Sequence, residues 1–348
     1  ATRNHGMPLE ALRYPRTPVG LHYLLTHFDI PCVDPADWTL QIDGAVATPL
    51  DLTLDDLMAR PRLSQTVTME CAGNGRALME PRPLSQPWLQ EAVGTAEWTG
   101  VSLAALLDES GVSGTAVEIV IAGLDRGVDG GVEQWYERSL SLDEARQPGV
   151  VLAYEMNGMR LLPQHGAPLR LVVPGWYGMT NVKWISRISA VDQPFAGYQQ
   201  SEAYVFRADN EDDGTKLSRI LPRALMVPPG IPDFYSRTRI VPVGPHRIEG
   251  KAWSGWAAID RVEVSVDGGR TWSDADVDAP ALGQWAWQSW TFDWNPTEPG
   301  EHVLCCRAGD AAGNDQAHFP SWNVGGYANP APQRVSATVV SSPPAATS

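Results

Sequence analysis

The chain has 348 residues, of which 43% are hydrophobic and 19% charged, and its net charge is −15, from 26 basic and 41 acidic side chains. This composition is typical of a soluble globular protein, and the length predicts about two domains. The acidic balance argues against nucleic acid or anionic lipid as a main partner, whereas a basic redox partner would suit it.

Targeting signals and paired metal-binding cysteines are not evident. No run of about 18 apolar residues occurs, so no transmembrane helix or membrane partner is predicted. Residues 1–20 set arginines and a glutamate among prolines, unlike a signal peptide. The expected compartment is the cytoplasm or, if a signal was removed before Ala1, the periplasm. No CxxC pair supports a zinc ribbon, an iron–sulfur site or c-type haem. The four cysteines are Cys32, Cys71, Cys305 and Cys306.

The first part of the chain predicts short strands mixed with short, capped helices. Residues 38–44 alternate like a strand and end in a turn, and residues 52–57 then form a short helix with Thr53 as its N-cap. Residues 98–107 predict a second entry from a loop into a helix, with Ser102 as the cap.

Two further segments of this part are expected to be buried strands. Residues 117–121 form one, and residues 169–175 form another that closes in a Pro-Gly turn. Because strands and helices follow no regular βαβ rhythm, we expect an α+β domain and not a doubly wound sheet.

The pattern changes after a polar stretch at residues 207–219, which is the best candidate for a linker or a long loop. Residues 262–272 alternate and then turn through Asp-Gly-Gly, which is a strong hairpin signal. Strands are also predicted at residues 285–292 and 302–308. Eight of the 14 tryptophans lie after residue 250, which suits the core of a β-sandwich.

These patterns predict a three-part organisation. A catalytic domain is expected at residues 1–215, a β-sandwich at residues 216–340, and a disordered tail rich in Ser, Pro and Ala at residues 341–348.

The most informative stretch is residues 67–76, where an apolar, β-branched run ends in a single thiol and then turns through glycines. This pattern predicts a strand that delivers Cys71 to a loop. Gly73 and Gly75 would let the backbone approach another group closely, and Arg76 would supply the positive charge that favours a thiolate. The alternative is a structural cysteine buried before a turn.

This stretch closely resembles the molybdenum-ligating cysteine motif of the sulfite oxidase family. Residues 164–175 resemble the family's His-Gly-x-Pro-x-Arg block, and residues 178–184 resemble its Val-Lys-Trp block, at fitting spacing. The resemblance covers about residues 5–340. It implies a sulfite-oxidase-type α+β molybdopterin-binding domain followed by an immunoglobulin-like β-sandwich, through which the chain would form a homodimer.

The resemblance also implies a site for molybdenum and molybdopterin. Cys71 would be the metal ligand, and Tyr204 would be the active-site tyrosine, with Tyr198 as its replacement if the register is shifted. Guanidinium and ammonium groups suit the cofactor's phosphate, and an acidic side chain suits the nitrogen donors of its pterin. The cofactor-binding residues implied are His27, Cys71, Asp125, His165, Arg170 and Lys183.

Two positions of the expected substrate pocket depart from the family. Its sulfite-oxidising members carry arginines where this chain has Leu25 and Gln288. Because neither side chain offers a charged fork, efficient sulfite binding would need compensation by Arg76, Arg207 or another cation.

The leading interpretation is a molybdenum-dependent oxidoreductase that transfers an oxygen atom to sulfite or a related small sulfur compound. No segment is left over for a haem or flavin domain, so electrons are expected to pass to an external carrier. Three alternatives stay open: a reductase of neutral sulfoxides or N-oxides, a non-catalytic β-sandwich binding protein, and a cysteine hydrolase. In the hydrolase, Cys71 would be the nucleophile and His27 or His165 the base.

Overall fold

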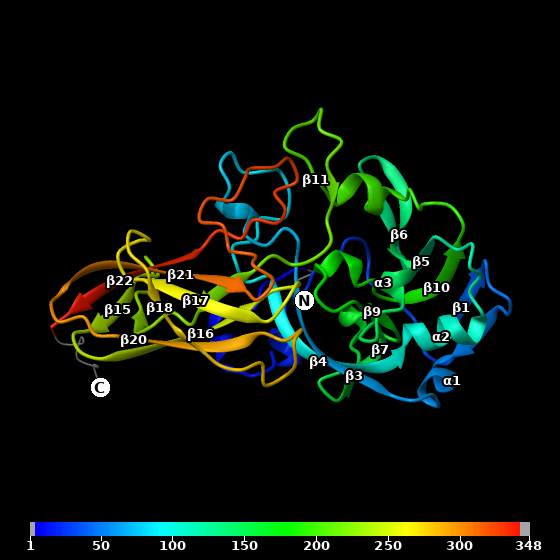
Figure 1. Ribbon diagram of the computed structural model, residues 1–348, viewed down its shortest axis with the longest axis horizontal. Helices are drawn as coiled ribbons and strands as arrows, with labels where there is room; N and C mark the ends of the chain where they lie inside the picture. Colours follow the sequence, from blue (N-terminus) through cyan, green and yellow to red (C-terminus); the bar gives the residue numbers. More distant parts are fainter. Residues whose placement is uncertain (1–3, 342–348) are drawn as a thin grey trace.

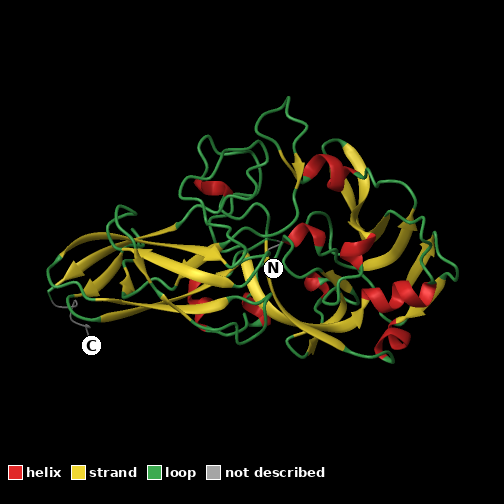
Figure 2. Cartoon of the chain, in the orientation of Figure 1, coloured by secondary structure: helices red, strands yellow, loops and turns green. Residues whose placement is uncertain are grey.

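The computed structural model describes residues 4–341 and consists mainly of β-sheet (Figure 2). The molecule is elongated, with a first region that carries three short α-helices and a second region built from long strands (Figure 1). Residues 342–348, which hold almost all of the tail predicted to be disordered, lie outside the described residues. No helix within residues 4–341 is long and apolar enough to cross a membrane.

The first region contains two five-stranded sheets that share a hydrophobic core. One sheet has the order β2-β1-β10-β5-β6, in which only β1 and β10 run parallel. The other has the order β3-β4-β7-β8, with β9 paired to β7. Buried residues from both sheets, such as Ile42, Ile121 and Leu152, belong to one cluster, so the sheets pack against each other. The strands are β1 Thr39–Gly44, β2 Leu50–Thr53, β3 Leu63–Glu70, β4 Val93–Ser102, β5 Glu118–Asp129, β6 Val132–Ser141, β7 Val151–Met156, β8 Met159–Arg160, β9 Arg170–Val172 and β10 Ile185–Val191.

The α-helices of this region begin at capping side chains. Thr53 Oγ1 accepts the N–H of Asp56, whose carboxylate accepts the N–H of Thr53 in return, which forms a capping box. Ser102 caps the next helix through its Oγ. Both predicted N-caps are therefore confirmed. Residues 98–102, expected to be a loop, instead belong to β4, because they pair with β3 or β7. The helices are α1 Leu54–Met58, α2 Leu103–Ser110 and α3 Leu142–Ala145.

The polar stretch predicted as a linker begins with an ordered loop between two short strands. Figure 1 shows this loop projecting from the molecule beside the label of β11. Within it, the Asp212 carboxylate accepts the backbone N–H groups of Ala208 and Gly214, each at 2.8 Å. The short elements of the first region are the 3₁₀ helices Leu9–Arg13, Val19–Leu21, Arg76–Leu78, Pro163–His165 and Gly178–Thr180, the π-helix Gln199–Ala203, and strands β11 Val205–Phe206 and β12 Thr215–Lys216.

The second region is a sandwich of two sheets. One has the order β13-β16-β20-β19, and the other has the order β14-β15-β22-β21-β17-β18. Trp290 from the first sheet and Val262 and Leu304 from the second are wholly buried in one core. The predicted hairpin is confirmed as β17 and β18. The strands are β13 Arg223–Met226, β14 Ile231–Pro232, β15 Arg239–Pro242, β16 His246–Trp253, β17 Ile259–Ser265, β18 Ser273–Asp274, β19 Asp276–Val277, β20 Gln288–Trp294, β21 Gly300–Asp310 and β22 Gln333–Val340.

The predicted fold class holds in its coarse form, since a mixed domain is followed by a sandwich. The α-helices are short, as expected, with five, eight and four residues, and β-sheet predominates. The strand predicted at residues 285–292 begins later, at Gln288, and residues 302–308 lie inside β21. The immunoglobulin-like topology and the domain boundary after residue 215 stay predictions.

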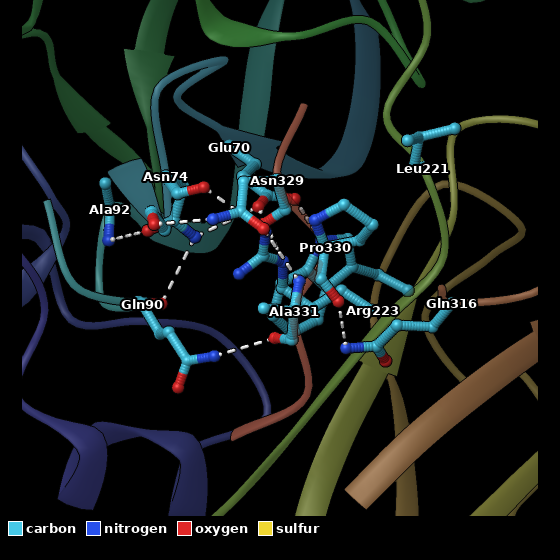
Figure 3. Close-up of polar contacts among 12 residues, drawn as sticks. Glu70, Asn74, Gln90, Ala92, Leu221, Arg223, Gln316, Asn329, Pro330 and Ala331 are labelled. Atoms are coloured by element: carbon cyan, nitrogen blue, oxygen red, sulfur yellow. Dashed lines mark hydrogen bonds and ion pairs between the residues drawn. The ribbon is translucent and has the colours of Figure 1, made fainter. Parts of the chain in front are cut away.

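A buried carboxylate joins the two regions where β3 ends. Glu70, the last residue of β3, is 1% exposed, and its Oε1 lies 2.9 Å from the Nε of Arg223 at the start of β13. Glu70 also accepts hydrogen bonds from Asn74 Nδ2 and, at 2.8 Å, from Trp253 Nε1 of the sandwich. The guanidinium of Arg223 in turn donates to the carbonyl oxygens of Asn74 and Asn329 (Figure 3).

Further polar contacts surround this pair. Gln90 Nε2 donates to the Ala331 carbonyl at 2.9 Å, and Gln316 Nε2 donates to the Pro330 carbonyl at 2.7 Å (Figure 3). Because the Glu70–Arg223 pair and the side chains of Gln90 and Gln316 are buried, these bonds are costly to leave unmade. The junction is therefore expected to hold the two regions in a fixed relation.

Replacement of Arg223 with methionine tests this junction. It should lower the free energy of unfolding by about 3–5 kcal/mol, because Glu70 would be left as an uncompensated buried charge. The control is Arg247→Met, which breaks an exposed pair with Asp293 and should cost less than about 1 kcal/mol. The measurement is chemical denaturation followed by tryptophan fluorescence. Equal, small losses in both variants would contradict the proposed role of the junction.

Candidate active site

One cavity in the first region gathers most of the site residues predicted from the sequence. Its walls come from the segment before β1, the end of β3, the loop before β9 and the segment that leads into β10. Of the nine predicted residues, eight line this cavity, and Gln288 does not. The eight are Leu25, His27, Cys71, Asp125, His165, Arg170, Lys183 and Tyr204.

Cys71 follows β3 directly, as predicted, and its backbone is fixed on both sides. Its N–H donates to the Ala92 carbonyl and its own carbonyl accepts from Asn74 N–H, both at 2.9 Å. Gly75 has a φ of 91°, and a Cβ there would lie 2.7 Å from the Asn329 oxygen, so glycine is required. A Cβ at Gly73 would lie 2.5 Å from the guanidinium of Arg76, so a larger residue there would require the end of that side chain to move.

The Cys71 thiol is buried, with 6% of the residue exposed. Burial raises its pKa, and the nearby Gly73 amide and Arg76 charge only partly oppose this effect. A free thiol would therefore be protonated at neutral pH, and a soft metal ion would have to displace the proton on binding.

The wall formed by β9 and the segment before β10 carries positive charge. Arg170 Nη1 donates to the His165 carbonyl at 3.0 Å, and its guanidinium carbon lies 4.6 Å from the centre of the Trp98 ring. Burial lowers the pKa of Arg170 to about 10, so it stays charged. Lys183 Nζ donates to the Leu25 carbonyl at 2.8 Å. Burial, reinforced by Arg170, lowers the pKa of Lys183 to about 7, so this side chain is only partly charged at neutral pH. Within residues 4–341, neither cation forms a salt bridge.

Two histidines stand beside these cations, and only one was predicted. Burial lowers the pKa of His165 to about 3 and that of His22 to about 4, so both rings are neutral at neutral pH. His22 Nδ1 lies 3.0 Å from the Tyr23 carbonyl oxygen. Sequence reasoning missed His22 because none of the motifs that carry the resemblance includes it.

The cavity is surrounded by buried polar atoms that lack a partner within residues 4–341. They include His22 Nε2, Arg170 Nε and Asp125 Oδ1. Burial raises the pKa of Asp125, and the charge of Lys183 opposes that shift. Unpaired buried polar atoms are costly, which indicates that a polar ligand completes them. The thiol suits a soft metal ion, the basic side chains suit an anionic group, and the carboxylate suits the N–H donors of a polar heterocycle. One ligand that combines these three parts would fit the cavity.

A second wall presents a tyrosine paired with a histidine. His27 Nε2 is hydrogen-bonded to the Tyr204 hydroxyl, and the His27 ring stacks on Tyr136 with ring centres 4.5 Å apart. Burial, reinforced by Lys183 and Arg138, lowers the pKa of His27 to about 3, and burial raises that of Tyr204 well above its usual range. The pair is therefore neutral, and the phenol keeps its proton. Tyr198, the alternative to Tyr204, does not line the cavity.

Gln288 is a correction to the predicted pocket. It begins β20 and its side-chain amide is used inside the sandwich, where Nε2 donates to the carbonyls of Ile259 and Asp278, both at 3.1 Å. Its Oε1 accepts the Ile259 N–H at 2.6 Å. With all these groups satisfied, Gln288 is not directed to the cavity, whereas Leu25 lies in the wall as expected.

The two cations named as compensation for the missing arginines also lie outside the cavity lining. Arg76 donates to the carbonyls of Gln86 and Gly325, at 3.0 and 2.9 Å. Arg207 pairs with Glu202 at 3.1 Å.

The geometry gives no support to a cysteine hydrolase. Within residues 4–341, no histidine is hydrogen-bonded to Cys71 Sγ, and His27 Nε2 is already engaged by Tyr204. A nucleophilic cysteine requires such a base within hydrogen-bonding reach.

Comparison with known proteins yields matches along most of the chain. Residues 27–199 match the family described as "Oxidoreductase molybdopterin binding domain", and residues 236–339 match "Mo-co oxidoreductase dimerisation domain". The chain is 34% identical over 343 residues to mitochondrial sulfite oxidase of Mus musculus, which covers 93% of this chain and 62% of that protein. It is also 34% identical over 329 residues to sulfite oxidase of Gallus gallus, with 89% and 70% covered.

A solved structure supports the same relationship. The sulfane dehydrogenase SoxCD of Paracoccus pantotrophus superposes with a TM-score of 0.81 at 29% identity, over 94% of this chain and 82% of that chain. The chain spans less than two thirds of the length of the mouse protein.

The cationic wall can be tested through cofactor retention. Arg170→Met should weaken binding of the molybdenum cofactor by about 10–100-fold, because a charged hydrogen-bonding group contributes about 1.5–3 kcal/mol. Molybdenum and pterin per chain would be measured in the purified protein, with thermal unfolding as a check of the fold. The matched control is Arg187→Met on β10, which removes an exposed pair with Asp43. Undiminished cofactor in Arg170→Met would contradict this assignment.

Proposed function

Because this chain belongs to the sulfite oxidase family of molybdenum-cofactor oxidoreductases, we propose that it oxidises sulfite or a related anionic sulfur compound. In the reaction with sulfite, one oxygen atom derived from water is transferred to sulfur, and two electrons and two protons are released. The electrons would pass to an external carrier. The convergence of Cys71, the cations Arg170 and Lys183, and the Tyr204–His27 pair on one cavity carries this proposal.

Each wall would have a separate task. Cys71 would ligate the metal, while Arg170, His165, Lys183 and Asp125 would hold the phosphate and pterin. When bound, the cofactor would supply an exchangeable oxygen atom and accept two electrons.

The other wall would orient the substrate. Tyr204, which keeps its proton, would donate a hydrogen bond to a substrate oxygen. The neutral His27 ring, stacked on Tyr136, would fix the orientation of that hydroxyl.

A second candidate keeps the cofactor and reverses the direction of oxygen transfer, by reduction of neutral sulfoxides or N-oxides. One observation favours it: Leu25 presents an apolar side chain to the cavity where a sulfite-binding arginine was expected.

A non-catalytic binding protein fits the site less well. A cofactor pocket that had lost its function would gain stability by pairing its buried polar atoms, yet Arg170 Nε, His22 Nε2 and Asp125 Oδ1 have no hydrogen-bond partner within residues 4–341.

A substrate panel tests the function directly. The holoenzyme should oxidise sulfite or thiosulfate with an artificial electron acceptor and should show at least about tenfold lower activity with dimethyl sulfoxide and a reduced donor. Cys71→Ser should keep the fold but lose all oxygen-atom transfer, because a hard oxygen donor replaces a soft thiolate. Turnover confined to the neutral substrate would favour the reductase. Full activity in Cys71→Ser would contradict both candidates.

We also propose a homodimer formed by the sandwich, consistent with the match to a dimerisation domain. The turn between β14 and β15 exposes 77% of Phe234 and 91% of Tyr235 at the edge of the larger sheet, and aromatic side chains are enriched at interfaces. Sedimentation should give a dimer at micromolar concentration. Phe234→Ser with Tyr235→Ser should weaken it at least about tenfold, whereas the exposed Leu84→Ser should not. A monomeric wild type would contradict the proposal.

A further inference from the structure

Arg138 is a buried cation that the proposed mechanism does not use. It lies on β6, where it pairs in register with Ile121 of β5, and it is 1% exposed. Its Nη1 donates to the backbone carbonyl of Gln199 in the π-helix. Its Nε has no hydrogen-bond partner within residues 4–341, and the described residues include no salt bridge to it.

The surroundings of Arg138 are aromatic. Its guanidinium carbon lies 5.7 Å from the centre of the Tyr204 ring, so the charge sits behind the tyrosine that lines the cavity. The Tyr204 ring is in turn 5.3 Å from Tyr327. Burial lowers the pKa of Arg138, while the nearby Tyr136, Tyr204 and Tyr327 oppose that shift. Arginine nevertheless stays protonated in proteins.

A buried charge without a carboxylate is unusual, because its desolvation is not repaid by an ion pair. One carbonyl oxygen and an aromatic face recover only part of that cost. A negative charge that enters the cavity beyond Tyr204 would recover more of it. The arrangement is therefore better suited to an anionic occupant than to a neutral one.

The other candidate cations have other partners. Arg76 and Arg207 are held outside the cavity, and Arg170 and Lys183 belong to the wall assigned to the cofactor. Leu25 contributes no charge, and Gln288 is satisfied within the sandwich. Of these basic residues, only Arg138 has its guanidinium over the Tyr204 ring.

We propose that Arg138 is the positioning residue that makes this site selective for small oxyanions, in place of the arginines missing at Leu25 and Gln288. It acts through Tyr204: a cation against the phenol ring draws electron density from it and strengthens the hydrogen bond that its O–H donates to an anionic oxygen. Its charge also attracts the anion across a poorly solvated region. This inference rests on the proposed function for the identity of the substrate, a sulfur oxyanion.

Binding of sulfate to the holoenzyme tests this role separately from turnover. In titration calorimetry, Arg138→Gln should weaken sulfate binding at least about tenfold, because glutamine can still donate to the Gln199 carbonyl but carries no charge. Arg138→Lys should restore affinity to within about threefold of the wild type, because it restores the charge. Arg126→Met, which removes an exposed arginine of the neighbouring β5, is the control and should bind like the wild type.

A structural role would give a different pattern. If Arg138 only held the fold, Arg138→Gln would lose cofactor and thermal stability, and any loss of binding would apply equally to sulfate and to neutral dimethyl sulfoxide. We expect unchanged molybdenum content, unchanged affinity for dimethyl sulfoxide and a raised KM for sulfite with little change in kcat. Equal sulfate affinity in the wild type and Arg138→Gln would overturn the proposal, as would failure of Arg138→Lys to restore binding.

The two proposals fail in distinguishable ways. If the wild type does not oxidise sulfur oxyanions but binds sulfate in an Arg138-dependent manner, the proposed function is wrong and the oxyanion selectivity stands. If it oxidises sulfite and Arg138→Gln binds sulfate and turns over sulfite as the wild type does, the function stands and the role of Arg138 is wrong.

Discussion

The arrangement of this molecule depends on the buried Glu70 carboxylate. It ends β3, one residue before Cys71, and its oxygens are bound by Asn74 of the cysteine loop and by Arg223 and Trp253 of the sandwich. Since the same carboxylate fixes the loop and the second region, the thiol cannot shift without breaking bonds at the junction. Among the described residues, the sandwich contributes none to the cavity lining, but through Glu70 it helps to fix the position of the cysteine loop.

Several of the buried polar groups that lack a hydrogen-bond partner within residues 4–341 lie around the cavity. In an ordinary core, polar atoms find partners when the chain folds, as Gln288 does within the sandwich. Around the cavity, the imidazole of His22, the carboxylate of Asp125 and the guanidinium of Arg170 each have a buried atom with no partner in the described part of the chain. Leaving these groups unpaired costs free energy, and the same residues are those that would bind the cofactor.

Local features were predictable from the sequence, and long-range ones were not. Thr53, Ser102 and the strand-to-loop position of Cys71 follow from patterns within a few residues, and all three agree with the structure. The family resemblance added the residues that share the cavity. Gln288 was misplaced because sequence position does not reveal which way the first side chain of a strand points. His22, Arg223 and Arg138 were missed because their meaning lies in partners that the fold brings together from distant segments.

The chain is acidic overall, but basic side chains are gathered around the cavity. The chain carries a net charge of −15, yet the cations Arg170, Lys183 and Arg138 are held around one cavity without a carboxylate salt bridge among the described residues. The exposed acidic groups are screened by salt within about 10 Å, whereas charges beside a poorly solvated cavity keep most of their strength. An anion is therefore disfavoured only at a distance and is attracted once it enters. The cofactor's phosphate would be bound by Arg170 and Lys183. The positive charge that remains to attract an anionic substrate would then be mainly that of Arg138, which lies behind the substrate-facing Tyr204.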